Sequence, residues 1–253
     1  MWRTRRQLTA LLIIVLVVGG IGFLFVRNLL PEPTCFDNRK NQGEEDTDCG
    51  GSCLPCIFRN RRPIQVFWTR VTPVRGGVYA AVAEVKNPNN ALGISEFEYL
   101  LKLFDDKDAL VIEKRGTSFL YADEVSHVVE TNLRSERPIV RGVLEIGRTD
   151  YVIRDDNPPD LIAGEKELLL VSQNGGTTEL KARLFNRTLN DFRAISVHGI
   201  LLDQSQNVLA VSSVLLDEVR GGEAKEIRFF WPGEIKNVSV MLVEPRVNTL
   251  TNN

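Results

Sequence analysis

Residues 95–104 read SEFEYLLKLF, and their alternation decides the fold class. Apolar residues take every second position on one face, namely Phe97, Tyr99, Leu101 and Leu103. The opposite face carries polar residues, namely Glu96, Glu98 and Lys102. This period of two is typical of a half-buried antiparallel strand. We therefore predict a body built from β-strands.

Eleven further runs on either side of this strand have the same character. We predict strands at 64–70, 78–86, 110–113, 125–132, 139–146, 167–173, 179–186, 195–202, 208–215, 225–231 and 238–243. No stretch of the body offers a long 3.6-residue periodicity with helix caps, so the fold class is all-β.

The body repeats itself. The segment VKNP at residues 85–88, followed by the strand that ends at Asp105, aligns with LFNR at residues 184–187, followed by a strand that ends at Asp203. Asn87 and Asn186 are 99 residues apart, and the two aspartates are 98 apart. A period near 100 residues exceeds that of solenoid repeats and matches the size of a sandwich domain.

We therefore predict two tandem antiparallel β-sandwich domains of the immunoglobulin-like kind, at 61–156 and 160–247, followed by a tail at 248–253. Hairpin turns are expected at 105–108 and 203–207. Trp68 and Trp231 are expected to fill the two cores. The polar, proline-containing run at 155–160 is expected to be a linker, so that each domain folds separately.

Both copies resemble the sandwich domains of the FxLYD and late-embryogenesis-abundant type 2 groups. Asn87 and Asn186 end an early strand, and Leu103-Phe104-Asp105 and Leu201-Leu202-Asp203 end a long apolar strand. The resemblance covers most of residues 61–247. It implies an extracytoplasmic structural or interaction role without catalytic residues.

A long apolar run precedes the body. It begins at Leu8, ends at Val26 and contains no charged residue. A helix of this length covers roughly the 30 Å hydrocarbon core of a bilayer. The alternative is a cleaved signal peptide, but signal h-regions run to about 7–15 residues and end at a small-x-small site, which this run lacks. We predict a single transmembrane helix at 8–30, with the membrane as one partner.

Charge and cysteine usage orient the chain. Arg3, Arg5 and Arg6 precede the span, and the positive-inside rule then places residues 1–7 in the cytoplasm and the body outside it. All four cysteines follow the span, where an oxidising compartment lets them pair. Without those arginines, 28 of the 31 basic residues remain against 33 acidic ones, so no nucleic-acid partner is expected.

The cysteines lie at 35, 49, 53 and 56, within a region at 34–57 that has no hydrophobic periodicity. We expect two disulfides among Cys35, Cys49, Cys53 and Cys56, and the sequence leaves three pairings open. We favour Cys35 with Cys53 and Cys49 with Cys56, because a bridge within CLPC closes a very tight loop. A four-thiolate zinc site usually needs two Cys-x-x-Cys pairs, and Cys35 stands alone, so the sequence disfavours zinc. A redox motif at Cys53 and Cys56 would need a strand–helix context, which this region lacks.

The same loop is rich in oxygen ligands. They surround Gly43 at short intervals and are the side chains of Asp37, Asn41, Glu44, Asp46 and Asp48. Calcium takes six to eight such oxygens, although the spacing departs from an EF-hand loop; the alternative is a solvated acidic loop. The residues from Cys35 to Cys56 resemble a cysteine-rich motif of secreted and cell-surface proteins, which implies an extracellular unit that confers no activity by itself.

Three function classes follow. We favour a membrane-anchored extracytoplasmic module that is not an enzyme, has no cofactor and binds a protein partner at the cell envelope. The second class is a calcium- or metal-responsive binding protein, and the third is an anchored hydrolase. For the hydrolase, the two histidines, His127 and His198, both lie within predicted strands, where cross-strand packing is commoner than base catalysis.

Overall fold

The computed structural model describes residues 2–29, 34–154, 157–171 and 176–251. It forms two compact units, Met1–Asn60 and Arg61–Asn253, which are described separately. In the first unit, helix α1 (Trp2–Leu29) contains the segment Arg6–Phe25, which by length and composition can cross a membrane. The prediction of an apolar N-terminal helix is therefore confirmed. Its predicted last residue, Leu30, lies outside the described residues.

The cysteine-rich module contains little regular structure, consisting of turns, an isolated bridge between Asp46 and Cys49, and one 3₁₀ turn, η1 (Cys56–Phe58). Tight turns explain two of its glycines. A Cβ on Gly51 would lie 2.4 Å from the Gly43 carbonyl oxygen, and both glycines have positive φ. Side chains other than hydrogen cannot occupy such positions without strain.

The described residues of the second unit form twelve strands. The first six are β1 (Gln65–Arg75), β2 (Val78–Lys86), β3 (Leu92–Phe104), β4 (Leu110–Leu120), β5 (Val125–Arg134) and β6 (Arg141–Ile153). The second six are β7 (Leu161–Val171), β8 (Thr177–Asn186), β9 (Phe192–Leu202), β10 (Val208–Val219), β11 (Ala224–Pro232) and β12 (Val240–Arg246). All twelve predicted strands are present, and most are longer than predicted. The predicted end of the seventh, 172–173, lies outside the described residues, as do residues 155–156 of the predicted linker.

The strands form four antiparallel three-stranded sheets with one topology used twice. Sheets β1-β2-β5 and β4-β3-β6 make the first sandwich, and sheets β11-β8-β7 and β10-β9-β12 make the second. Adding six to each strand number of the first sandwich reproduces the second. The sequence repeat is thus a repeat of strand order.

Matching polar residues hold matching turns in the two sandwiches. Asp105 Oδ1 accepts from the backbone N–H groups of residues 107 and 109, and Asp203 Oδ1 accepts from those of residues 205 and 207. Both predicted hairpin turns are therefore confirmed. Asn87 and Asn186 are buried, and each donates from Nδ2 to backbone carbonyls of neighbouring loops, which satisfies groups that would otherwise be orphaned.

Each sandwich has its own core. Phe97, Leu101 and Leu103 of β3 are at most 2% exposed inside the first, as the alternation predicts. Leu180, Leu201 and Trp231 lie in the second. The prediction that Trp231 fills a core is confirmed.

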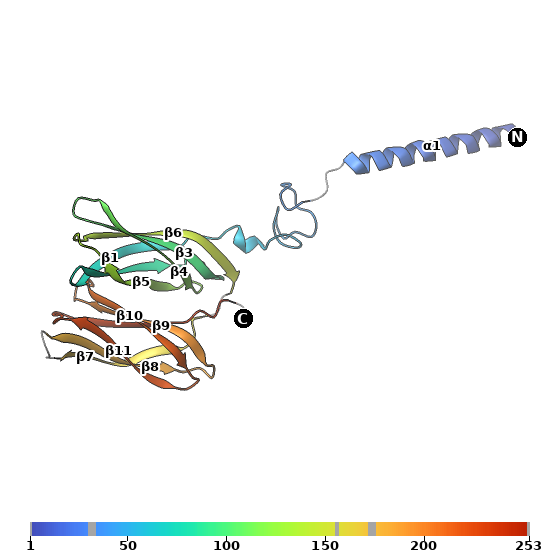
Figure 1. Cartoon of the computed structure of the whole chain (residues 1–253). Coiled ribbons are helices and arrows are strands. Elements are labelled where there is room, and N and C mark those ends of the chain that lie inside the picture. The colour runs from blue at the N-terminus through green and yellow to red at the C-terminus, as the bar shows by residue number, and fades with distance from the viewer. Residues whose placement is uncertain (1, 30–33, 155–156, 172–175, 252–253) are drawn as a thin grey trace. The chain divides into compact units, whose positions relative to one another are not determined.

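A third apolar cluster lies between the sandwiches. Ala80 and Val82 of β2 face Ile200 and Val211 from β9 and β10 in what we call the shared cluster. The prediction that Trp68 fills a core is wrong, because Trp68 packs against this shared cluster. Figure 1 shows the resulting four layers, with the inner sheets β1-β2-β5 and β10-β9-β12 face to face and the outer sheets β4-β3-β6 and β11-β8-β7 beyond them.

Candidate functional sites in the cysteine-rich module and between the sandwiches

Two disulfides hold the cysteine-rich module together. They join Cys35 to Cys53 and Cys49 to Cys56, which is the pairing favoured from sequence. The module buries few apolar side chains, so these bonds replace a hydrophobic core. In the chain-entropy model, closing a loop of about 15 residues contributes roughly 3 kcal/mol.

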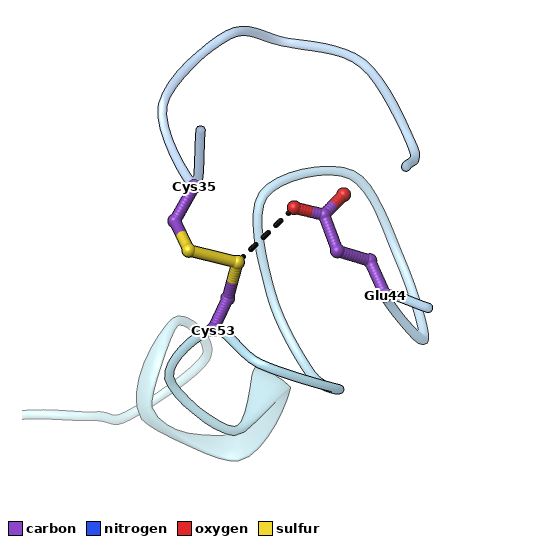
Figure 2. Close-up of side chains that lie close together, drawn as sticks. All are labelled: Cys35, Glu44 and Cys53. Atoms are coloured by element: carbon purple, nitrogen blue, oxygen red, sulfur yellow. Dashed lines mark hydrogen bonds between the residues drawn. A yellow bond between two sulfur atoms is a disulfide. The ribbon is translucent and has the colours of Figure 1, made fainter. Parts of the chain in front are cut away.

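A buried carboxylate lies against one of these disulfides. Glu44 is 5% exposed, and its Oε1 lies 3.2 Å from Cys53 Sγ. Figure 2 shows the Glu44 carboxylate turned toward the Cys35–Cys53 disulfide. Its Oε2 accepts from the backbone N–H groups of Asn41 and Asp48 at 3.2 and 3.1 Å. Ligand atoms of Cys35, Glu44 and Cys53 lie within 4.8 Å of one another. Since both sulfurs are joined in a disulfide, neither is the thiolate that a metal ion requires.

The other predicted calcium ligands make protein hydrogen bonds. Asp37 accepts from Asn41 Nδ2 at 2.7 Å, which is the main reason that its pKa lies below the ordinary value. Asp48 accepts from the backbone N–H of residue 38, and Asp46 forms an ion pair with Arg59 at 2.9 Å. Asn41 Oδ1 is buried and has no hydrogen-bond partner among the described residues. Calcium binding stays a prediction, and it would require several of these side chains to exchange their present partners for the ion.

The second candidate site is the polar end of the inner sheets. On β9, His198 pairs across the sheet with Ser213 of β10 and Glu244 of β12. On β2, Glu84 pairs with Trp68 of β1 and His127 of β5. These two rows meet where His127 Nδ1 lies 2.6 Å from Glu244 Oε2. Polar residues therefore continue the interface beyond the shared cluster.

Glu244 is the centre of this network. Its carboxylate accepts from the hydroxyl of Ser126, the backbone N–H of His127 and Nη1 of Arg246. Burial opposes ionisation of the Glu244 side chain, but the hydrogen bond from His127 and the charge of Arg246 outweigh it and lower its pKa to about 2. The carboxylate is thus ionised throughout the physiological range.

Arg246 ties the same network to the first sandwich. Its side chain is 4% exposed and pairs with Glu124 and Glu244 at 3.1 and 3.2 Å. Its Nη2 donates to the Phe119 carbonyl at 2.5 Å, and the guanidinium carbon lies 4.5 Å from the centroid of the Phe119 ring. A buried arginine with these partners has its charge compensated, and loss of one partner would be costly.

His198 lies beside this network in its neutral form. Its Nδ1 lies 3.0 Å from Ser213 Oγ, and the residue is 9% exposed. Burial is the main cause that lowers the pKa of His198 to about 4. The charge of Glu244 opposes this shift, and the charges of Arg246 and His127 act with burial. No carboxylate of the described residues bonds to this imidazole, so it lacks the orienting partner of a catalytic triad.

The C-terminal segment returns to the first sandwich. The Tyr121 hydroxyl donates to the Val247 carbonyl at 2.8 Å, and Asn248 Nδ2 donates to the Ser95 carbonyl at 2.9 Å. Leu250 is 2% exposed and lies over Gly93, where an added Cβ would be only 3.0 Å from the leucine. Part of the predicted tail is therefore bound to the fold; its last two residues lie outside the described residues.

A cleft of about 230 Å³ opens at this polar end. Strands of the first sandwich contribute Tyr99, residues 117–119 and residues 127–129 to its wall. The second sandwich contributes Ser196, His198, Ser213 and Arg246. The cleft exists only because the two sandwiches are docked.

Sequence reasoning missed Glu244, Arg246 and Tyr121 as members of a site. Their contacts join residues more than 100 positions apart, so no local pattern reveals them. One signal was present: residues 78–83, VYAAVA, are apolar on both faces of the strand. Near-continuous apolar runs indicate strands that are covered on both faces.

Comparisons with known proteins identify no family. No family model matches the chain, and no curated protein matches it. Among solved structures, the crystal structure of red sea bream transglutaminase is 10% identical with a TM-score of 0.21 over 75% of this chain, which spans 32% of that protein. The tandem CBM22 domains of Paenibacillus barcinonensis Xyn10C are 8% identical with a TM-score of 0.15, covering 76% of this chain and 87% of theirs. Scores this low support no inference about function.

Proposed function

We propose that this protein is a single-pass membrane protein whose β-sandwich body lies outside the cytoplasm and acts there as a non-catalytic interaction or structural module. The observation that carries the proposal is the disulfide-linked module that follows the apolar helix in the chain. Disulfides persist in oxidising compartments and are rare in the cytosol. The three arginines before the span favour the same orientation.

The body supports an interaction role more than a catalytic one. The Ser213–His198 pair resembles a nucleophile and base, but an imidazole with a pKa near 4 is a weak base at neutral pH. Glu244 is committed to Arg246 and His127, and Tyr99 donates its hydroxyl to Glu130 at 2.8 Å. The Glu244–His127 contact joins the two sandwiches, whereas the Tyr99–Glu130 bond lies within the first sandwich. The partner that we infer is a protein of the cell envelope.

Protease accessibility tests the topology. Protease added to intact spheroplasts should digest the body, while a cytoplasmic marker survives. As a matched control, replacing Arg3, Arg5 and Arg6 with glutamate should reduce or reverse the orientation, because the positive-inside rule counts lysine and arginine. A wild-type body that resists protease while a known external domain is lost would refute the proposal.

Thiol labelling tests the compartment independently. Under denaturing conditions, the four cysteines of protein taken from cells should all be unreactive before reduction and reactive after it. Four free thiols in freshly isolated protein would contradict an extracytoplasmic location.

A calcium-responsive module is the second candidate. It is favoured by the buried Oδ1 of Asn41, which has no hydrogen-bond partner in the part of the chain that the structure describes. Calcium bound to the folded module alone would stabilise that module. Calcium should then raise the temperature at which the module unfolds, and Asp37→Asn with Asp48→Asn should abolish the shift. An unchanged transition at saturating calcium would exclude this function.

A further inference from the structure

The cleft between the sandwiches has hydrogen-bonding groups that the protein does not use. Ser118 and Ser196 line it, and among the described residues their hydroxyls have no hydrogen-bond partner. Thr117 also lines it, but as the cross-strand partner of Glu98 it has its side chain on the opposite face of β4 from Ser118. His198 is nine-tenths buried, and its Nε2 likewise has no partner among the described residues. A hydroxyl both donates and accepts, and a neutral imidazole does each with a different nitrogen. The wall therefore offers donors and acceptors side by side.

The charges around the cleft are already paired. The guanidinium of Arg246 and the imidazole of His127 line it, and carboxylates contact both of them. Those carboxylates, Glu84, Glu124 and Glu244, do not themselves line the cleft. An anionic ligand would meet no unpaired positive charge, and a cationic ligand would meet no carboxylate. Both kinds of ion would lose hydration without compensation, so the cleft suits a neutral ligand.

Size and apolar surface narrow the class of ligand. The volume of about 230 Å³ lies below the roughly 300–1,000 Å³ of sites for drug-sized molecules, which favours a single ring. Phe119, Val128 and Val129 add an apolar surface to the polar wall. A sugar ring has hydroxyls at its edge and apolar C–H groups on its faces, so it can contact the polar and the apolar parts of this wall at once.

We propose that this cleft binds one neutral sugar ring, held by the hydroxyls of Ser118 and Ser196 together with His198. The inference rests on the proposed interaction role, for which it names a ligand class. Residues from both sandwiches contact the ring, so binding requires the docked arrangement of the inner sheets. Ser118 and Ser196 are both partly exposed, which leaves the cleft accessible from solvent.

Saturation-transfer NMR on the full chain tests the proposal, in a detergent without a sugar headgroup. The probes are glucose, galactose and mannose, with glucuronate as the charged counterpart. At least one neutral hexose should bind, and glucuronate should bind more weakly. Ser118→Ala and Ser196→Ala should each weaken binding about three- to ten-fold, the loss expected for one hydrogen bond.

Ser205→Ala serves as the matched control, because Ser205 is exposed on the turn after β9 and does not line the cleft. It should leave affinity unchanged, and thermal unfolding should show that all three variants fold. The proposal is overturned if no neutral hexose binds, if neither cleft variant weakens binding, or if glucuronate binds more tightly than every neutral hexose. A body found in the cytoplasm would refute the proposed location and leave these binding results intact.

Discussion

The two sandwiches share one strand order but bury opposite sheets. The first docks through β1-β2-β5, whereas the second docks through β10-β9-β12, the counterpart of β4-β3-β6. At the offset of 99 residues set by Asn87 and Asn186, Ala80 corresponds to Glu179 and Val82 to Lys181. In the first sandwich these two positions hold apolar residues, Ala80 and Val82, whereas in the second sandwich they hold charged residues, Glu179 and Lys181. The residues that form the interface thus lie on the strand faces that point away from each core, and they differ between two sandwiches that share the same strand order.

The substitution with the largest expected effect disrupts the core of the second sandwich. Leu201 is fully buried in the second core, so Leu201→Asp should cost more than about 4 kcal/mol and abolish the cooperative unfolding of the second sandwich. Leu202→Asp is the matched control, because Leu202 is only partly buried against the shared cluster. It should cost roughly 1–3 kcal/mol. Equal effects of the two variants in urea unfolding would contradict the assigned faces.

The second largest effect is expected when a residue of the shared cluster is replaced by the residue at the equivalent position of the second sandwich. Ala80→Glu introduces the residue that the second copy carries, and a charge in the shared cluster should cost about 3 kcal/mol. Each core stays intact, so calorimetry should show separate transitions for the two sandwiches. The mirror change, Lys181→Val on the outer sheet, should alter stability by only about 0.5 kcal/mol. A single unchanged transition in Ala80→Glu would show that the interface contributes little.

Acid should weaken the same interface from its polar end. The folded pKa of His198 is about 4, below the ordinary value near 6.5, so the unfolded chain takes up a proton first as the pH falls. Stability should fall between about pH 6.5 and 4, by up to about 3 kcal/mol. Glu244, with its lowered pKa, should add a further loss between about pH 4.5 and 2.

Urea unfolding at several pH values measures this dependence, and His198→Gln is its control. The variant should lose the slope between about pH 6.5 and 4 and keep the loss below it. A wild-type stability that is flat across this range would show that His198 titrates normally.

The smallest expected effect comes from replacing Asn87 or Asn186, and the loss of stability should be the same in the two sandwiches. Asn87→Ala and Asn186→Ala each leave buried backbone carbonyls without a donor, which should cost about 2 kcal/mol. Denaturant midpoints measure both. Clearly different costs would show that the two asparagines have different roles.

Local patterns predicted the strands, the turns at Asp105 and Asp203, and the cysteine pairing, because each depends on nearby residues. Alternation in residues 95–104 assigns one face to a core and leaves open what covers the other face. The same ambiguity applies to the strand that contains Trp68, whose pattern does not show whether this side chain faces its own core or the other sandwich. The network around Glu244 could not be predicted, since its contacts with His127 and Arg246 form only once the sandwiches dock.

The distance between the two outer sheets tests the docked arrangement most directly. All four native cysteines are in disulfides, so spin labels attach only to introduced thiols at Glu113→Cys on β4 and Glu226→Cys on β11. Both positions are exposed. Pulsed electron paramagnetic resonance should give one narrow distance distribution, which Ala80→Glu broadens. A broad distribution in the otherwise unaltered chain would show two sandwiches moving independently and would contradict the account.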